Sequence, residues 1–187
     1  MMQRRTSHLK KVKFISSLFF ICVAIFYLAH EKVSLSRQGT QDSIVTVLSV
    51  SDGDTVIVIL DKRKEKVRLI GIDAPELGQK PWGAEAKQHL ETLLASAGWK
   101  VKLEFDVEKR DKYGRILAYL RTADDKLINL LMVRNGYAML FTIPPNVRYA
   151  SELRAAQREA RGKRLGIWGS EGLRERPGDY RREHPRI

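Results

Sequence analysis

Two short acidic motifs have the residue types and spacing of a cation site. One motif, SDGDTV, contains Asp52 and Asp54, and a second, RLIGIDAPE, contains Asp73 followed by Ala74. A hard cation such as Ca²⁺ binds carboxylate and carbonyl oxygens, which the three aspartates and the backbone near Ala74 can supply. Taken singly, each aspartate could equally cap a turn or face solvent. Their combination, together with Arg68 and Glu76 in the second motif, predicts a site for a hard cation such as Ca²⁺.

Two arginines in or after these motifs could bind a phosphate group. Arg68 opens the RLIGIDAPE motif, and Arg115 ends a third motif, DKYGR. A guanidinium group is planar, stays charged and can grip phosphate through two parallel hydrogen bonds. Such groups suit a phosphorus centre that gains negative charge as it is attacked. The chemistry favoured by the three motifs together is therefore phosphodiester cleavage.

The order of the three motifs resembles that of the thermonuclease family, the staphylococcal-nuclease-like proteins. The resemblance continues to GIW at Gly166–Trp168 and covers roughly residues 43–168. Each motif alone is weak, because Asp-Gly is a common hairpin turn and Asp-x-Pro a common loop start. The family resemblance implies an OB-fold barrel and hydrolysis of DNA and RNA with little sequence preference. It also implies cleavage of the 5′ phosphorus–oxygen bond, which leaves 3′-phosphate ends.

The same resemblance implies roles for the acidic residues. The residues matching Asp54 and Asp73 hold Ca²⁺, the one matching Ala74 contributes its backbone carbonyl, and the one matching Asp52 acts through a water molecule. Alanine replaces the threonine of the best-known member at position 74, which a backbone ligand tolerates. Glu76, which follows a proline, is implied to be the general base on the attacking water, or to orient it.

Catalytic and substrate-binding roles follow by the same resemblance. Arg68 and Arg115 would bind the phosphate and stabilise the transition state. Lys112 and Tyr113 match positions that contact a terminal phosphate of a bound nucleotide. Phe141 matches a position that packs on the nucleoside, where an aromatic ring can stack on a base.

The alternative to an enzyme is a non-catalytic OB-fold module that binds nucleic acid or protein. Loss of the site residues would indicate such a module, because a fold does not by itself fix a function. The chain keeps all five of them: Asp54, Arg68, Asp73, Glu76 and Arg115. We therefore expect a phosphodiesterase. An exported protein that serves a secretion complex, with incidental nuclease activity, also remains open.

Hydrophobic periodicity predicts the elements that position these residues. Runs rich in β-branched residues predict strands, and apolar residues on one helical face predict helices that end near glycines. The predicted strands are residues 44–50, 55–60, 66–72, 100–107 and 116–122, and the predicted helices are residues 83–97, 127–135 and 149–164. Three strands, a helix and two strands is the order of a five-stranded OB-fold barrel.

Charge and hydropathy divide the chain into three parts. The net charge is +12, but residues 42–169 hold 22 basic and 17 acidic side chains, a surplus compatible with a polyanionic partner without requiring one. Residues 1–41 combine a basic head with the uncharged run 14–29, which predicts a retained membrane anchor or, less favoured, a cleaved signal. Residues 170–187 are predicted to be a flexible charged tail. The nuclease-like domain is expected to be monomeric and on the extracytoplasmic side.

Overall fold

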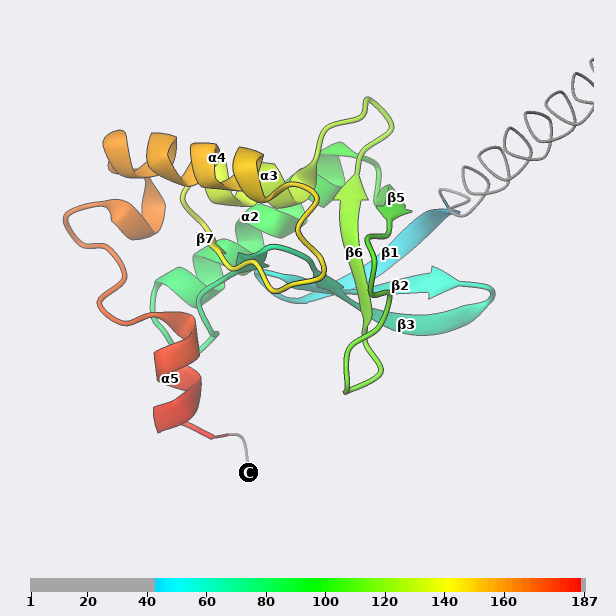
Figure 1. The fold of residues 1–187 in the computed structure, drawn as a ribbon, viewed down its shortest axis with the longest axis horizontal. Coiled ribbons are helices and arrows are strands. Elements are labelled where there is room, and N and C mark those ends of the chain that lie inside the picture. Colours follow the sequence, from blue (N-terminus) through cyan, green and yellow to red (C-terminus); the bar gives the residue numbers. More distant parts are fainter. Residues whose placement is uncertain (1–42, 186–187) are drawn as a thin grey trace, which may run out of the picture. The chain divides into compact units, whose positions relative to one another are not determined.

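The computed structural model describes residues 43–185, in which five strands close into a barrel (Figure 1). Buried aliphatic residues recur at every second position, as Val56 and Val58 do in β2, so one face of each strand fills the barrel interior. The barrel strands are β1 (Ser43–Asp52), β2 (Thr55–Leu60), β3 (Arg63–Leu69), β5 (Lys100–Glu104) and β6 (Ile116–Arg121). Their order around the barrel is β1-β2-β3-β6-β5. The predicted five-stranded barrel is confirmed.

One strand pairing in the barrel is parallel. Strands β3 and β6 pair in parallel with Arg68 opposite Leu117, whereas the other barrel pairings are antiparallel. This pairing brings two motifs far apart in sequence to neighbouring strands, because Arg115 directly precedes β6. The register therefore places the two predicted phosphate-binding arginines on the same side of the barrel wall.

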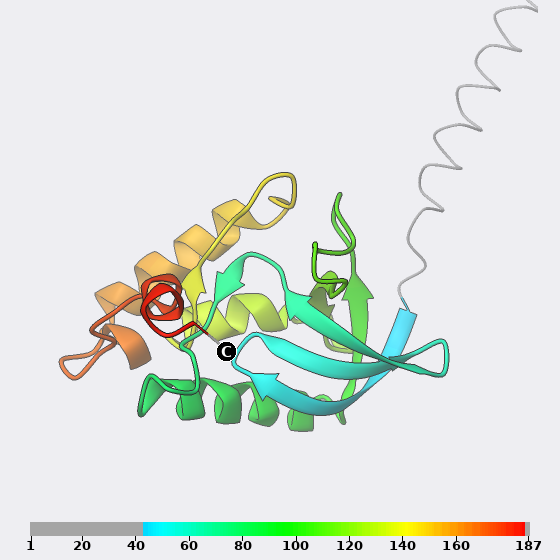
Figure 2. The same cartoon turned by 90° about the horizontal axis from the view of Figure 1, so that it is seen from below.

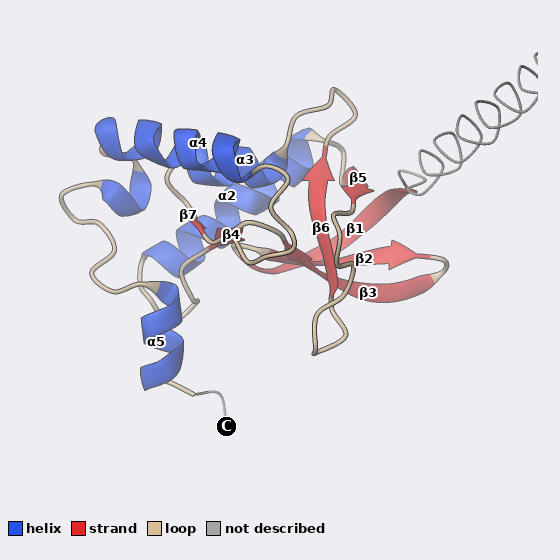
Figure 3. Ribbon diagram, in the orientation of Figure 1, coloured by secondary structure: helices blue, strands red, loops and turns tan. Residues whose placement is uncertain are grey.

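The helices lie to one side of the barrel (Figures 2 and 3). They are α2 (Trp82–Ser96), α3 (Ile128–Arg134), α4 (Ala150–Gly162), the 3₁₀ helix η1 (Gly166–Trp168) and α5 (Pro177–Glu183). Helix α2 contacts β1 and buries Ala86, Leu90 and Leu94, which recur at helical spacing. A two-stranded sheet of β4 (Ile72–Asp73) and β7 (Met139–Leu140) links the second motif to the region before α4.

The third strand differs from its prediction at both ends. The turn is limited to Asp61 and Lys62, both with positive φ, so β3 begins at Arg63 rather than at Lys66. The charged and largely exposed residues 63–66 pair with β2 through the backbone, which a count of apolar residues misses. At its far end, Gly71 with φ of 79° separates β3 from β4.

The carboxy-terminal segment differs from the predicted flexible tail. Residues 177–183 form α5, with Pro177 buried at the start of the helix. The run 14–29, interpreted as an anchor or signal, lies outside the described residues. Within residues 43–185, none of the helices has the length and apolar character needed to cross a bilayer.

Candidate active site

The turn between β1 and β2 holds Asp54 in a fixed orientation. Its Oδ1 accepts a hydrogen bond from the Thr55 hydroxyl at 2.9 Å, and its Oδ2 accepts one from the Ala74 backbone N–H at 2.9 Å. The backbone N–H of Asp54 in turn donates to Asp52 Oδ1 at 3.1 Å. Asp54 is only 6% exposed. The first motif is thus joined to the second by a buried carboxylate.

Gly53 permits this close approach of the two motifs. A Cβ atom at Gly53 would lie 2.6 Å from the Cβ of Ala74 and 2.7 Å from the Cβ of Ala86 on α2. These distances are shorter than real Cβ contacts, so a larger residue would push the turn away from β4 and α2. The small residues at 53 and 74 therefore set the spacing of the acidic site.

Arg68 bridges the two buried aspartates. Its Nη2 lies 3.1 Å from Asp54 Oδ2 and 3.2 Å from Asp73 Oδ1, and its Nη1 donates to the Leu69 carbonyl at 2.6 Å. The side chain is 14% exposed. Since one nitrogen contacts both carboxylates, the structure brings Asp54, Asp73 and Arg68 together as the motifs predict.

The acidic residues of the site are crowded beyond what their neighbours neutralise. Burial, followed by the negative charge of Asp54, raises the pKa of Asp52 to about 6. Burial also raises the pKa of Asp73, against the lowering effects of Arg181 and Arg68. Shifts of this kind mark places where added positive charge is stabilising.

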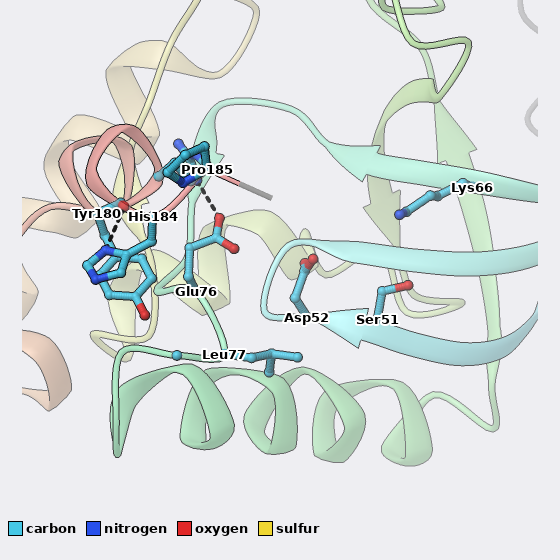
Figure 4. A pocket seen from close by; sticks show the side chains of 10 residues that line it. Ser51, Asp52, Lys66, Glu76, Leu77, Tyr180, His184 and Pro185 are labelled. Atoms are coloured by element: carbon cyan, nitrogen blue, oxygen red, sulfur yellow. Dashed lines mark hydrogen bonds and ion pairs between the residues drawn. The ribbon is translucent and has the colours of Figure 1, made fainter. Parts of the chain in front are cut away.

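Glu76 is fixed by the start of α2. Its backbone N–H donates to Gln79 Oε1 at 2.9 Å, and a Cβ at Gly83 would lie 2.0 Å from the Glu76 carbonyl oxygen. Figure 4 shows the Glu76 side chain between Asp52 of the β1–β2 hairpin and Tyr180 of α5, beside a pocket of about 430 Å³. The predicted general base thus faces the acidic turn.

Arg115 lines a larger groove of about 1020 Å³, which Arg68 and Glu76 also line. Its Nε donates to Asp111 Oδ2 at 2.7 Å, and the Asp111 carboxylate also accepts the backbone N–H of Arg115. This Asp111 contact closes the DKYGR turn and orients the guanidinium. The three predicted catalytic side chains therefore share one groove.

The predicted substrate-binding residues line the same groove. Lys112 stands over the ring of Tyr113, with Nζ 5.1 Å from the ring centroid. Tyr113, Phe141 and Ile143 are exposed large side chains, and Arg115 as well as Lys112 stands over the Tyr113 ring. Their positions fit base or sugar contacts, and their roles stay predictions.

The oxygen donors of the site fit a hard cation in chemistry. Asp54 and Asp73 are within hydrogen-bonding distance of one arginine nitrogen, and both are buried. Over residues 43–185, however, no three acidic, histidine or cysteine side chains converge as a metal-binding group. Arginine nitrogens lie among the carboxylates instead. A metal ion that binds Asp73 would therefore have to displace an arginine that pairs with this carboxylate.

Arg181 is the site residue that the sequence analysis missed. It lies on α5 and contacts both Asp73 and Glu76. A signal for this helix exists, since Pro177 stands at its first turn with Asp179, and Arg181 and Arg182 stand at its last turn. No apolar stripe accompanies these signals.

Comparison with known proteins agrees with the geometry. The sequence profile described as "Staphylococcal nuclease homologue" matches residues 66–170. A thermonuclease of Staphylococcus intermedius is 39% identical over 127 residues, which cover 65% of this chain and 74% of that protein. A thermonuclease of Staphylococcus hyicus is 31% identical over 142 residues (73% and 82%), and endonuclease YncB of Bacillus subtilis is 35% identical over 135 residues (68% and 63%).

Proposed function

The chain belongs to the family of staphylococcal nuclease homologues and is a nuclease hydrolase, and from this premise we propose that it is a Ca²⁺-dependent enzyme that cleaves DNA and RNA with little sequence preference. One observation carries the proposal. The buried carboxylates of Asp54 and Asp73 meet at Arg68, beside a groove that Glu76 and Arg115 also line. Hydrolysis of a phosphodiester needs this set of groups in one place.

The protein's own residues have distinct tasks in this mechanism. Glu76 takes a proton from the attacking water while the water oxygen bonds to phosphorus. The bond from phosphorus to the 5′ oxygen then breaks. The products are a 3′-phosphate and a 5′-hydroxyl. Arg68, which the Leu69 carbonyl holds at 2.6 Å, and Arg115, which Asp111 holds, bind the phosphate oxygens.

Asp54, Asp73 and the Ala74 carbonyl are the ligands we propose for Ca²⁺, with Asp52 acting through water. Bound there, the cation supplies positive charge beside a phosphate that becomes more negative during attack. The raised pKa values of Asp52 and Asp73 support the proposal, because burial disfavours their charged forms and a bound cation would offset that cost.

The test uses the full-length protein and two substrates, plasmid DNA and a single-stranded RNA. Both should be cut with Ca²⁺ and left intact with a Ca²⁺-selective chelator, and the products should carry 3′-phosphate ends. Chelator-resistant cleavage would remove Ca²⁺ from the mechanism. Tight binding of both substrates without any cleavage would support the non-catalytic binding module.

We also propose that residues 14–29 anchor the protein in a membrane with the nuclease domain on the extracytoplasmic side. Lys and Arg precede this uncharged run, and positively charged flanks stay on the cytoplasmic side. The full-length protein should fractionate with membranes, and protease added outside the cytoplasm should digest the nuclease domain. A freely soluble mature protein that begins near His30 would indicate a cleaved signal instead.

A further inference from the structure

Residues 170–185 return to the candidate active site and dock on the loop that carries Glu76. Gln79 Nε2 donates to the Glu175 carbonyl at 2.8 Å, and Trp82 Nε1 donates to the Glu171 carbonyl at 3.1 Å. A Cβ at Gly78 would lie 2.1 Å from the Tyr180 hydroxyl oxygen. Contacts from three successive parts of the segment thus seat α5 beside Glu76.

Arg181 extends from α5 into the acidic site. Its Nη1 lies 3.1 Å from Asp73 Oδ1 and its Nη2 lies 2.9 Å from Asp73 Oδ2, so the guanidinium grips this carboxylate with both nitrogens. The same Nη1 lies 2.8 Å from Glu76 Oε1. Such two-pronged pairing is among the strongest side-chain interactions of arginine. A single cation thereby holds a proposed metal ligand and the proposed general base.

The excess of carboxylates in the acidic site explains why the Arg181 guanidinium is held between Asp73 and Glu76. Asp52, Asp54, Asp73 and Glu76 lie in or beside the groove, and the ion pairs described for this acidic set are with Arg68 and Arg181. Arg68 belongs to the barrel wall, whereas Arg181 lies on a short helix. The Arg181 side chain is 39% exposed. Arg181 is therefore the cation that can leave with the least disturbance of the fold.

We propose that Arg181 is a tethered competitor of the divalent cation: it occupies the acidic site of the free enzyme and leaves Asp73 and Glu76 when Ca²⁺ binds. This inference rests on the proposed Ca²⁺-dependent function. Both cations need the same Asp73 oxygens, so binding of one weakens binding of the other. Arg181 and His184 also line the groove, so their departure opens the end of it nearest α5.

The test measures Ca²⁺ binding to the full-length protein by titration calorimetry, without nucleic acid. Arg181→Gln removes the competing charge and should lower the Kd for Ca²⁺ by about tenfold, within the usual range of coupling between two ligands. Arg181→Lys, which keeps the charge but not the fork, should lower it less. Arg182→Gln is the matched control, because Arg182 lies on the same helix and pairs with Asp179. It should leave the Kd unchanged.

Amide hydrogen exchange supplies a second measurement that does not depend on a variant. The amides of Tyr180 and His184 are hydrogen-bonded in α5, and saturating Ca²⁺ should speed their exchange in the parent protein. Unchanged Ca²⁺ affinity in Arg181→Gln, or unchanged exchange in α5, would overturn the competitor role. A lower kcat in Arg181→Gln at unchanged Ca²⁺ affinity would likewise overturn it and indicate that Arg181 acts in the transition state.

These results are distinguishable from failure of the proposed function. If the parent protein cuts DNA with Ca²⁺ but Arg181→Gln binds Ca²⁺ no more tightly, only the competitor role fails. If neither protein binds Ca²⁺ and cleavage persists in chelator, the Ca²⁺-dependent function itself fails, and the competitor role fails with it.

Discussion

Two clusters of charged side chains in this protein shift the pKa values of their carboxylates in opposite directions. In the Glu104 cluster, made of Glu104, Arg121, Arg148 and Tyr149, one carboxylate accepts hydrogen bonds from three side chains at 2.5 to 2.7 Å. Burial alone would raise the pKa of Glu104, but the bonds from Tyr149, Arg121 and Arg148 hold it below its usual range. In the active site, the pKa values of Asp52 and Asp73 are raised instead.

The contrast separates a structural use of charge from a functional one. The Glu104 cluster satisfies its carboxylate with donors from its own chain, which joins β5 and β6 to the start of α4. The active site gathers several carboxylates around fewer cations, so it gains from any added positive charge. Replacing a glutamate by glutamine should therefore lower stability in the Glu104 cluster and lower activity in the candidate active site.

The largest effect is expected for Glu76→Gln. The amide cannot take a proton from water, so kcat should fall by about a hundredfold or more, the usual contribution of a general base. Single-turnover cleavage of a labelled oligonucleotide measures this, with the melting temperature recorded alongside. A variant that cuts at the parental rate would exclude Glu76 as the base.

Arg68→Lys should be next. Lysine keeps the positive charge but loses the planar fork that reaches Asp54, Asp73 and the Leu69 carbonyl, so kcat should fall by about a hundredfold while nucleic-acid binding largely persists. Kinetics and filter binding on the same preparation separate the two quantities. Weaker binding with kcat unchanged would instead place Arg68 in uniform substrate binding.

The matched change in the other cluster is Glu104→Gln. It weakens three charge-assisted hydrogen bonds and should lower the free energy of unfolding by about 1–3 kcal/mol, as measured by urea denaturation. Its kcat should stay near the parental value under folding conditions. A loss of turnover as large as that of Glu76→Gln would contradict the division between the clusters.

The smallest expected effect is a pH dependence of that stability difference. Because the folded-state pKa of Glu104 is lowered from 4.5, ionised Glu104 stabilises the fold above the unfolded-state pKa, and this stability is lost as pH falls through the folded-state value. The difference between the parent protein and Glu104→Gln should therefore narrow below about pH 4.5. A difference that stays constant down to pH 3 would contradict this.

Local sequence patterns predicted most of the barrel and the proximity of Asp54, Arg68 and Asp73. Asp54 and Asp73 lie at strand ends that turn residues mark, and the five strands carry enough apolar residues for their order to be recognised. The charged start of β3 was missed because it pairs by backbone while its side chains face solvent. The close contacts at Gly53 and Gly83 depend on what lies opposite in space, which the sequence does not state.

Helix α5 was missed for a different physical reason. Its residues are polar, and its position depends on specific hydrogen bonds and ion pairs to partners near residue 76 rather than on an apolar stripe. Hydrophobic periodicity detects helices that bury an apolar face. A helix held by ion pairs and hydrogen bonds lacks such a face, so this pattern does not reveal it. The interactions that hold α5 thus join residues about a hundred positions apart.

The parallel pairing of β3 with β6 also bears on when the protein becomes active during its synthesis. Asp54, Asp73 and Glu76 leave the ribosome well before β6, and closure of the barrel joins segments roughly 50 residues apart. Until that pairing forms, Arg115 is not held next to the strand that carries Arg68. We therefore expect a truncated chain lacking β6 to have no nuclease activity, even though it contains Asp54, Asp73 and Glu76.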